Sequence, residues 1–372
     1  MKLSIKKEIL TESLNQVSKA ISTKNIIPVL SGIKFNLTME GLFLTCSDDD
    51  ITIEVFIDKK DINEIEEVGS IVIPGKYFID IVRKIPSDII KLETDGLRIV
   101  LYTNNAEYNL NGINANEFPN RDLDTIKTPI YINKKIFKNI INQTAFAASL
   151  QESRPILTGI NFNIKENILE CIATDSYRLS KKTITLNEVI EHEVNIVIPS
   201  KNLIELTKII DDEDENIEMH IFSNTILFKF NNILFQSRLL NGTYPDTSKL
   251  ISEECLLQIT SNLNELYNVI DRASLLTSEK EKNIVKMETT NNELIISSVS
   301  QEIGKIEERM KVEKSNETEV KIAFSSKYMM DALRALKSEN VILLLNGEIK
   351  PIIIKTPNNE NLIQLVLPIK TF

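Results

Sequence analysis

The residues best suited to catalysis are three successive carboxylates, Asp48, Asp49 and Asp50. Adjacent carboxylates can hold Mg²⁺ for phosphoryl transfer or for cutting a nucleic acid, so a metal-dependent nuclease is one hypothesis. Successive residues of a strand point to opposite faces, however, and three in a row rarely converge on one ion. A solvated turn is therefore the favoured interpretation, and no metal is expected.

No other group of residues favours an enzyme. His192 and His220 are isolated from any metal-binding or Ser/His arrangement. The ten glycines form no phosphate-binding loop. Cys46, Cys171 and Cys255 are odd in number and far apart in strand-like contexts, which predicts buried free thiols in a reducing cytoplasm. We expect no catalytic residue and no cofactor.

Length and composition describe an ordinary globular protein of more than one domain. The chain has 372 residues, of which 42% are hydrophobic and 26% charged. It contains no apolar run long enough for a bilayer and does not begin like a signal peptide, so we expect a cytoplasmic protein. The net charge of −10 argues against a protein that holds nucleic acid by charge alone.

Three basic residues reveal how the chain is organised. Lys76, Lys201 and Lys327 stand at the same place in three similar stretches, residues 69–86, 194–211 and 320–337. In each stretch an apolar run is followed by a short amphipathic pattern that carries basic residues. The lysines lie 125 and 126 residues apart, so the chain contains three copies of one domain. We predict domains over residues 1–126, 127–251 and 252–372, called the first, second and third copies.

Each copy is predicted to contain two helices and two groups of strands. The pattern is a helix, three strands with a break, a strand, a second helix and three more strands, with residues 28–37 as the first strand. Hairpin-length turns favour antiparallel pairing, and the small number of helices favours an α+β fold whose helices cover one face of the sheets. The six helices are expected over residues 6–22, 76–85, 134–149, 201–210, 262–276 and 326–337.

Charge is distributed unevenly between these helices and the remaining chain. The helices together carry +8, which leaves −18 for all other residues. One explanation is that Lys and Arg are good helix formers on solvated faces. The other is that the helices share a surface facing a polyanion, and the threefold repetition favours this second explanation.

Several separated motifs together resemble the bacterial sliding clamp, the beta subunit of the replicative DNA polymerase III. They are the three copies, Ile-Pro-Val-Leu at 27–30, Thr-Asp-Ser-Tyr-Arg-Leu at 174–179, Tyr-Pro-Asp at 244–246 and Leu-Val-Leu-Pro-Ile-Lys at 365–370. The resemblance covers the whole chain in order. It is specific as a set, although no single motif would suffice.

The resemblance implies a head-to-tail homodimeric ring, with sheets outside and helices lining a channel around double-stranded DNA. Retention would be topological and independent of sequence, which would reconcile DNA binding with the acidic charge. It implies DNA contacts near Lys24, Gln151 and Arg154. Position and charge add Lys76, Arg83, Lys138, Lys201, Arg272 and Arg334, for which an ordinary solvated surface is the alternative.

The resemblance also implies a peptide pocket between the second and third copies. Its partners would be the polymerase alpha subunit, clamp-loader subunits, other polymerases and repair proteins, all docking through short linear motifs. The lining would be Leu157, Thr174, Ser176, Tyr177, Arg178, Leu179, Pro245, Lys249, Leu250, Pro351, Leu365, Val366, Leu367, Pro368, Ile369 and Lys370. The chain departs from the family pattern at Tyr177, often His, and at Lys249 and Lys370, often Arg; Thr371 and Phe372 extend its tail.

For the joint between subunits, the resemblance implies that Tyr108 and Leu110 meet Leu275 and Leu276 of the other subunit. Asn105 and Glu107 lie where some relatives are basic, which leaves the charge pairing of this joint open. A peptide-binding scaffold that does not encircle DNA is the remaining rival to a clamp. Nothing in the sequence favours that rival.

Overall fold

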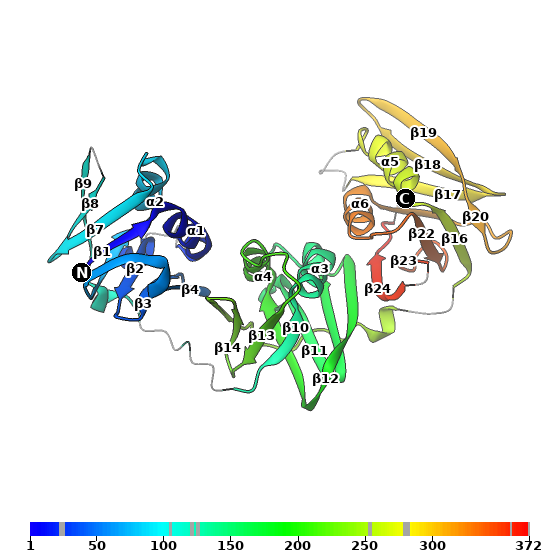
Figure 1. The fold of residues 1–372 in the computed structure, drawn as a ribbon. Coiled ribbons are helices and arrows are strands. Elements are labelled where there is room, and N and C mark those ends of the chain that lie inside the picture. The colour runs from blue at the N-terminus through cyan, green and yellow to red at the C-terminus, as the bar shows by residue number, and fades with distance from the viewer. Residues whose placement is uncertain are drawn as a thin grey trace. The chain divides into compact units, whose positions relative to one another are not determined.

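The computed structural model describes residues 1–21, 27–103, 106–119, 123, 127–251, 255–277, 283–357 and 359–370. Its internal contacts divide the chain into two compact units. Figure 1 shows the ribbon coloured along the sequence. The first unit contains residues 1–135 and 205–239, and the second contains 136–204 and 240–372. The second copy thus contributes strands to both units. No helix in the described part of the chain is long and apolar enough to cross a membrane.

The first unit contains two antiparallel sheets. The five-stranded sheet has the order β5 (Ile62–Glu67), β1 (Lys2–Lys6), β7 (Ile89–Asp95), β8 (Arg98–Tyr102) and β9 (Glu107–Asn111). The eight-stranded sheet has the order β10 (Ile130–Asn133), β13 (Asn216–Ile221), β14 (Thr225–Phe230), β15 (Ile233–Arg238), β4 (Ile51–Asp58), β3 (Gly41–Ser47), β2 (Gly32–Leu37) and β6 (Gly69–Pro74). Helices α1 (Lys7–Val17) and α2 (Gly75–Lys84) pack against each other.

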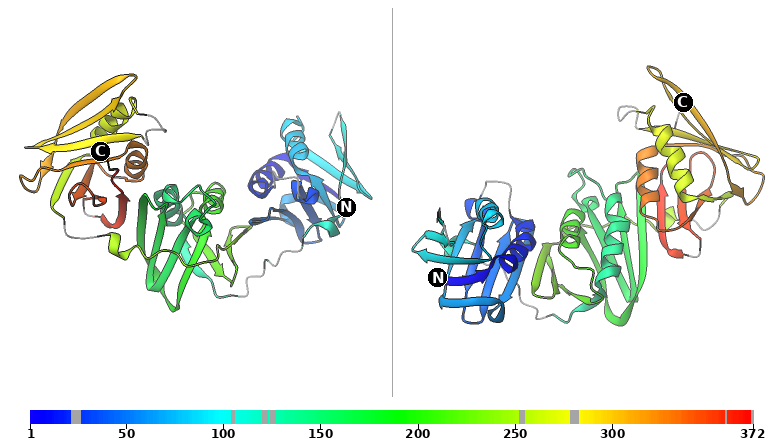
Figure 2. Two further views of the ribbon diagram at one scale, coloured as in Figure 1. Left: turned by 180° about the vertical axis from the view of Figure 1, so that it is seen from behind. Right: turned by 45° about the horizontal axis from the view of Figure 1, so that its top comes forward.

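The second unit also contains two antiparallel sheets. The seven-stranded sheet has the order β11 (Gly159–Thr174), β12 (Arg178–Pro199), β24 (Asn359–Val366), β23 (Ile352–Thr356), β22 (Asn340–Leu345), β16 (Leu257–Asn262) and β20 (Glu313–Lys314). The four-stranded sheet has the order β19 (Gly304–Lys311), β18 (Glu293–Ser300), β17 (Ile284–Thr290) and β21 (Lys321–Ser325). Helices α5 (Leu263–Ser274) and α6 (Ser326–Arg334) lie side by side in both views of Figure 2. The two remaining α-helices are α3 (Lys134–Thr144) and α4 (Ser200–Thr207).

Two strand pairs join successive copies, each inside one unit. In the first joint, β4 of the first copy pairs with β15 of the second, and Ile53 lies opposite Phe235. In the second joint, β12 of the second copy pairs with β24 of the third, and Ser180 lies opposite Gln364. A sheet that runs from one copy into the next satisfies the backbone groups of both edge strands.

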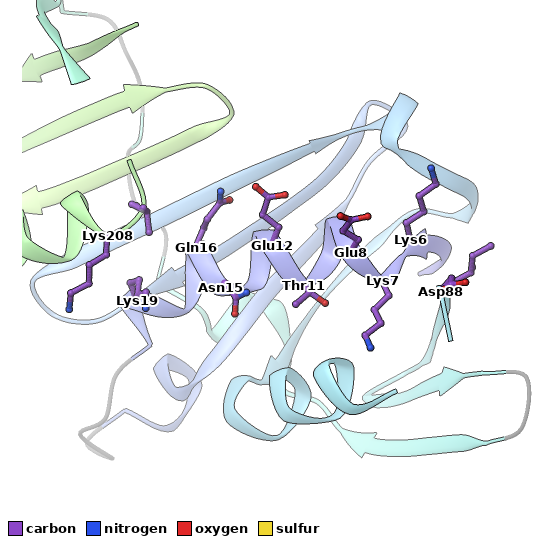
Figure 3. Close-up of a pocket in the computed structure, with 12 residues that line it drawn as sticks. Lys6, Lys7, Glu8, Thr11, Glu12, Asn15, Gln16, Lys19, Asp88 and Lys208 are labelled. Atoms are coloured by element: carbon purple, nitrogen blue, oxygen red, sulfur yellow. The ribbon is translucent and has the colours of Figure 1, made fainter. Parts of the chain in front are cut away.

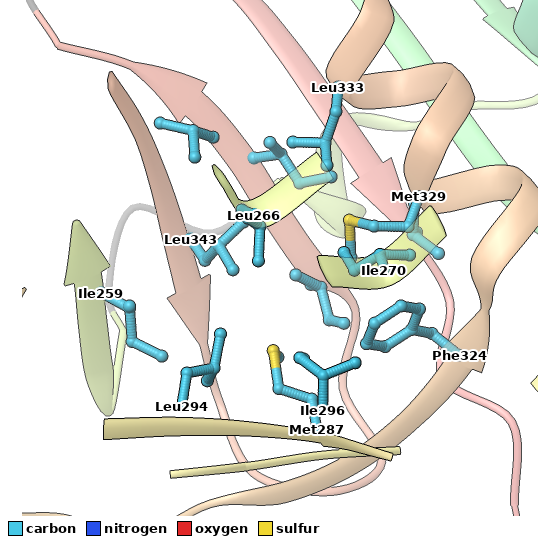
Figure 4. Close-up of a cluster of buried hydrophobic side chains, with 14 of the residues drawn as sticks. Ile259, Leu266, Ile270, Met287, Leu294, Ile296, Phe324, Met329, Leu333 and Leu343 are labelled. Carbon is cyan, nitrogen blue, oxygen red and sulfur yellow. The ribbon is translucent and has the colours of Figure 1, made fainter. Parts of the chain in front are cut away.

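The core of the third copy shows how the sequence pattern builds each copy. Leu266, Val269, Ile270 and Ala273 recur at helical spacing in α5, and all four are buried. They pack on alternate residues of the strands, so that helix and sheet share one apolar layer (Figure 4). Burying each large apolar side chain contributes roughly 1.5–3 kcal/mol.

The predicted α+β class, three copies and six helices are confirmed in the described part of the chain. Residues 28–31 are wrongly predicted as strand: Pro28–Ser31 forms a 3-10 helix, because proline fixes its own φ and cannot donate a ladder hydrogen bond. The prediction also misses the short strand before the first helix of each copy, namely β1, β10 and β16. These strands have four to six residues and run directly into the helices, so their alternation is hidden by the helical period.

Candidate functional site

The turn between β11 and β12 is fixed by its own side chains. The Asp175 carboxylate accepts hydrogen bonds from the amides of Tyr177 (2.9 Å) and Arg178 (3.0 Å). Thr174 Oγ1 accepts one from the Ser176 amide at 3.1 Å and donates to the Arg178 carbonyl at 2.6 Å. Ser176 has a positive φ of 77°, and the side chain of Tyr177 remains 62% exposed. The turn therefore presents an aromatic ring from a rigid backbone.

A turn of the same kind contains Asp48, the first of the three successive carboxylates in the first copy. Asp48 precedes β4 as Asp175 precedes β12, and its carboxylate accepts from the amides of Asp50 and Ile51 at 2.7 Å each. Asp48 is thus engaged in a turn, as the sequence interpretation holds. Among the described residues, no three His, Cys, Asp or Glu side chains cluster as metal ligands would.

Arg178 is a predicted lining residue that the structure buries. Its guanidinium bonds to Asp175 Oδ2 (3.0 Å) on its own turn and to Asp331 Oδ2 (2.7 Å) on α6. It also lies over the rings of Tyr328, at 4.6 Å from the centroid, and Phe146, at 5.4 Å. With 8% of its surface exposed, Arg178 links the second copy to the third through these contacts.

The C-terminal tail is pinned at two backbone positions. β24 ends at Val366, and the Leu367 amide then donates to the Tyr177 carbonyl at 2.9 Å. Pro368 has no amide hydrogen to donate, and the Ile369 amide donates a hydrogen bond to the Ala323 carbonyl at 2.7 Å. Leu367, Pro368 and Ile369 are half-buried and Lys370 is exposed. The tail thus holds partly exposed apolar side chains on a fixed backbone.

A small apolar cluster lies beneath this tail. Leu179, Leu344, Ile353 and Leu365 are buried together, and Leu367 packs against them. Leu179 and Leu365 therefore lie beneath the candidate site, whereas Leu367 keeps part of its surface exposed. Val366 and Leu157 are also buried.

The other predicted lining residues differ in accessibility. Pro245, Lys249 and Leu250 are exposed around the 3-10 helix Ser248–Leu250, and Pro351 is half-buried. All the predicted lining residues belong to the second unit, and the tail brings Leu367 directly to Tyr177.

Sequence reasoning missed four side chains that shape this site. Tyr328 stacks on Tyr177 with ring centroids 6.4 Å apart, and Phe146 and Asp331 contact Arg178. Tyr244 accepts a hydrogen bond from the Thr174 amide at 3.0 Å, and burial raises the pKa of its hydroxyl. Tyr244 stands in a motif already singled out and could have been included. The other three come from distant helical segments and carry no local signal.

The predicted DNA-binding residues differ in exposure and in the contacts that they make with the protein. Lys76, Gln151, Arg154 and Lys201 are exposed and Lys138 is half-buried, while Lys24 lies outside the described residues. Arg272 makes a two-pronged ion pair with Glu308, at 2.6–3.1 Å. Arg83 bonds to the Asn15 side chain, and Arg334 bonds to the Tyr267 hydroxyl and lies over that ring. These three arginines already have protein partners.

A groove of about 940 Å³ runs along the polar face of α1 (Figure 3). Its lining includes four cations that the prediction did not select, Lys6, Lys7, Lys19 and Lys208. Glu8, Glu12 and Asp88 interrupt this positive lining. Mixed charge of this kind gives weak attraction to a polyanion without a tight site.

The residues predicted for the subunit joint lie in separate units. Tyr108 and Leu110 are half-buried on β9, at the edge of the five-stranded sheet. Leu275 follows α5 with 74% of its surface exposed, and Leu276 is half-buried. Asn105 lies outside the described residues.

Comparisons with known proteins cover the whole chain. Models of the N-terminal, central and C-terminal domains of the DNA polymerase III beta subunit match residues 1–122, 131–246 and 249–370. The beta sliding clamps of Bacillus subtilis and Staphylococcus aureus are 42% and 40% identical, each over the full length of both chains.

Solved structures agree with these matches. A crystal structure of the DNA polymerase sliding clamp from Bacillus subtilis superposes with a TM-score of 0.97 at 41% identity, covering all of both chains. The DNA polymerase III beta chain from Streptococcus pneumoniae gives 0.96 at 36% identity, again over both whole chains. The chain therefore belongs to the DNA polymerase III beta subunit family, the beta sliding clamps.

Proposed function

We propose that this protein is a DNA sliding clamp, a processivity factor that encircles double-stranded DNA and tethers the replicative polymerase. Full-length membership of the family, with three clamp domains in one chain, is the observation that carries the proposal. The protein would act in the cytoplasm as a homodimer, without a catalytic residue or cofactor. The proposed domain limits remain 1–126, 127–251 and 252–372.

The charge distribution supports encirclement over adhesion. A net charge of −10 opposes tight attachment to phosphates, and the exposed Lys76 and Lys201 supply only scattered cations. A closed ring would not need tight attachment, because it is held on DNA by its topology. Weak contacts would also leave the ring free to slide.

Encirclement can be tested by loading the protein with a clamp loader onto closed circular DNA and washing at high salt. The clamp should stay on the circle and leave after a restriction enzyme linearises it. A basic DNA-binding protein of similar size serves as the control and should leave in the salt wash. Retention after linearisation would contradict topological holding and favour ordinary adhesion. Failure to load while still binding polymerase peptides would favour the scaffold alternative.

We further propose that the tail and the Asp175–Arg178 turn form the docking site for short linear motifs of the alpha subunit, clamp-loader subunits, other polymerases and repair proteins. Half-buried Leu367 and Ile369 and exposed Leu250 would receive apolar anchors. Each anchor contributes roughly 1.5–3 kcal/mol, so two or three give the weak binding that a shared site needs. Fixed backbones at Leu367 and Ile369 reduce the entropy lost on binding.

The docking site can be tested with a Leu367→Ala, Ile369→Ala double variant and a peptide from the polymerase tail. Peptide affinity should fall at least tenfold, since two apolar contacts are lost. Ile168→Ala with Val189→Ala is the control, because both residues are exposed elsewhere in the same unit. Equal peptide affinity in the two double variants would show that the tail is not part of the docking site.

A further inference from the structure

One carboxylate of the second unit bonds to residues of both proposed binding surfaces. Asp331 lies on α6, and its Oδ2 accepts a hydrogen bond from Arg178 Nη1 at 2.7 Å. Its Oδ1 accepts one from Arg334 Nη1 at 3.5 Å. Arg178 belongs to the turn proposed for peptide docking, whereas Arg334 is one of the predicted DNA contacts. Asp331 is therefore shared between the two surfaces, and all three residues belong to one unit.

The two contacts of Asp331 differ in strength. In its short pair with Arg178, the arginine side chain is only 9% exposed and the aspartate 24%. Such a charge-assisted hydrogen bond is strong, because little water competes for it. The pair with Arg334 is longer, and this arginine side chain is 62% exposed. Arg334 can therefore leave Asp331 without disturbing the packing around α6.

The Arg178 side of this arrangement reaches the surface through stacked rings. The Arg178 guanidinium lies 4.6 Å from the ring centroid of Tyr328, and its Nε donates to Asp175 Oδ2 of the same turn at 3.0 Å. The half-buried Tyr328 stacks on the exposed ring of Tyr177, with 22° between the ring planes. The position of Arg178 therefore helps to fix the aromatic surface that a peptide would meet.

The Arg334 side has a neutral second partner. Arg334 Nη2 donates to the Tyr267 hydroxyl, and the guanidinium lies 5.3 Å from the centroid of that ring. Neither contact neutralises the charge of Arg334. In the part of the chain that the structure describes, Asp331 is the one carboxylate that forms an ion pair with it. A phosphate that approached Arg334 would therefore compete with Asp331 for this arginine.

We propose that Asp331 couples the two surfaces, so that DNA at Arg334 strengthens peptide docking at Tyr177 and Tyr328. A phosphate bound to Arg334 withdraws one of the two cations from Asp331 and repels its carboxylate. Both effects leave Asp331 to Arg178, and the stronger pair holds the two rings in place for a peptide. Coupling between two sites is reciprocal, so a docked peptide would also release Arg334 to a phosphate. This inference rests on the clamp function and the docking site proposed above.

The coupling would direct partner proteins to clamps that already encircle DNA, because a free clamp would bind the same peptide less tightly. Coupling between two sites typically changes an affinity by about 5–150-fold. The exposure of Arg334 weakens its pair with Asp331, so we expect the lower end of that range, about fivefold.

The coupling can be measured with a fluorescent peptide from the polymerase tail. Its dissociation constant is determined by anisotropy for the free protein and for protein that has been loaded onto closed circular DNA and separated from the clamp loader. The peptide should bind about fivefold more tightly to the loaded protein.

Arg334→Gln is the variant that discriminates best. Without Arg334, Asp331 is left to Arg178 even in the free protein, so the free variant should bind the peptide about as tightly as the loaded natural chain does. The difference between free and loaded protein should then disappear. Because Arg334 is exposed, the substitution leaves the core intact. A merely structural role would instead leave peptide affinity equal or lower.

Lys337→Gln is the matched control. It removes the same charge three residues further along, from an exposed side chain that bonds to Asn139 and not to Asp331. The difference between free and loaded protein should persist in this variant. Equal changes in the two variants would reveal a general effect of charge and would overturn the coupling through Asp331.

Asp331→Asn tests the carboxylate itself. An amide carries no charge to divide between the two arginines, so free and loaded variant should bind the peptide equally. The comparison is made within one protein, and a change in overall peptide affinity therefore does not affect the ratio. A difference of about fivefold that survives in Asp331→Asn would overturn the inference.

The outcomes separate this inference from the functions on which it rests. A natural chain that is not retained on closed circular DNA would overturn the clamp function, and one that does not bind the peptide would overturn the docking site. A natural chain that does both, but binds the peptide equally on and off DNA, would overturn the coupling alone.

Discussion

The first and second joints have the same backbone arrangement but opposite side-chain chemistry. Ile53 and Phe235 meet in the first joint with no surface exposed. In the second joint, Ser180 and Gln364 are equally buried, and the Oε1 atoms of Gln364 and nearby Gln143 have no hydrogen-bond partner within the described chain. Backbone pairing therefore builds a joint, and the side chains determine how it is held.

This difference predicts two kinds of stability. Each apolar side chain of the first joint contributes roughly 1.5–3 kcal/mol through burial alone. In the second joint, each unsatisfied amide oxygen costs about 1–3 kcal/mol, and the Arg178 ion pairs and ring contacts oppose that cost. The second joint should thus depend on a few specific contacts, whereas the first depends on shape and area.

The largest expected effect is on the apolar joint. Phe235→Ala should lower the free energy of unfolding by about 3–5 kcal/mol, because it leaves a cavity where a fully buried ring was. Urea denaturation measures the change. Leu234→Ala, on the same strand but half-buried, is the control and should cost clearly less. A loss below about 1 kcal/mol for Phe235→Ala would contradict an apolar joint held by packing.

A smaller loss is expected from the polar joint. Arg178→Met should cost about 1.5–3 kcal/mol, since it removes two charge-assisted hydrogen bonds, while the 24% exposure of Asp331 lets water replace part of them. Hydrogen exchange of the β24 amides should increase. Arg309→Met removes two ion pairs, with Glu293 and Glu307, but the arginine is 59% exposed, so the change should cost less than about 1 kcal/mol. Similar losses in the two variants would show that burial does not strengthen the Arg178 contacts.

Local patterns were enough to predict the repeat, the helices and the fold class. Amphipathic spacing in α5 and strand alternation in β3 and β4 depend on neighbours in the sequence, and both are confirmed. The strands β1, β10 and β16 were not predicted, because each strand has six residues or fewer and runs directly into a helix. Their partner strands lie more than about fifty residues away, so no local pattern identifies them.

The candidate site was predictable only in part. The tail and the 174–179 turn were identified through a family resemblance, and the structure shows Leu367 bonded to Tyr177. The burial of Arg178 was not predictable, because Asp331 and Tyr328 reach it from about 150 residues further along the chain. The sequence shows a basic residue in a motif, but its exposure depends on tertiary contacts.

A stabilising change would sharpen the comparison of the two joints. Gln143→Met with Gln364→Leu removes both unpaired oxygens, each of which costs about 1–3 kcal/mol. It also removes two weak hydrogen bonds of 3.3 Å, from the amide nitrogens to the carbonyls of Ala335 and Gln143, which offset part of the gain. The free energy of unfolding should stay equal or rise by up to about 2 kcal/mol. The Gln364→Leu single variant, which leaves Gln143 in place, is the control, and its free energy of unfolding should rise less than that of the double variant. A loss above about 2 kcal/mol in the double variant would mean that water or another group satisfies these oxygens.

The smallest effect concerns pH and the other buried cation, Lys134 of the first unit. Its ammonium is fully buried and bonds to Asp211 at 3.1 Å and Glu215 at 3.0 Å. Burial alone would raise the pKa of Asp211, but hydrogen bonds from Asn231, Lys134 and the Glu213 amide outweigh it and lower that pKa below 3.8.

A carboxyl group whose pKa is lowered in the folded protein stabilises the fold at pH values above its unfolded-state pKa. This contribution to stability is lost as the pH falls through the folded-state pKa. Asp211→Asn should therefore be less stable than the natural chain at about pH 7, and the difference should shrink as the pH falls below the ordinary carboxyl pKa of 3.8. The difference should stay below about 1 kcal/mol, because the Asp211 side chain is 34% exposed. Urea denaturation of both proteins across this range measures it. A difference that does not change with pH would show that Asp211 acts through packing and not through its charge. The ion pair of Lys134 with Asp211 would then add no acid sensitivity to the stability of the first unit, just as the apolar pair of Ile53 and Phe235 adds none.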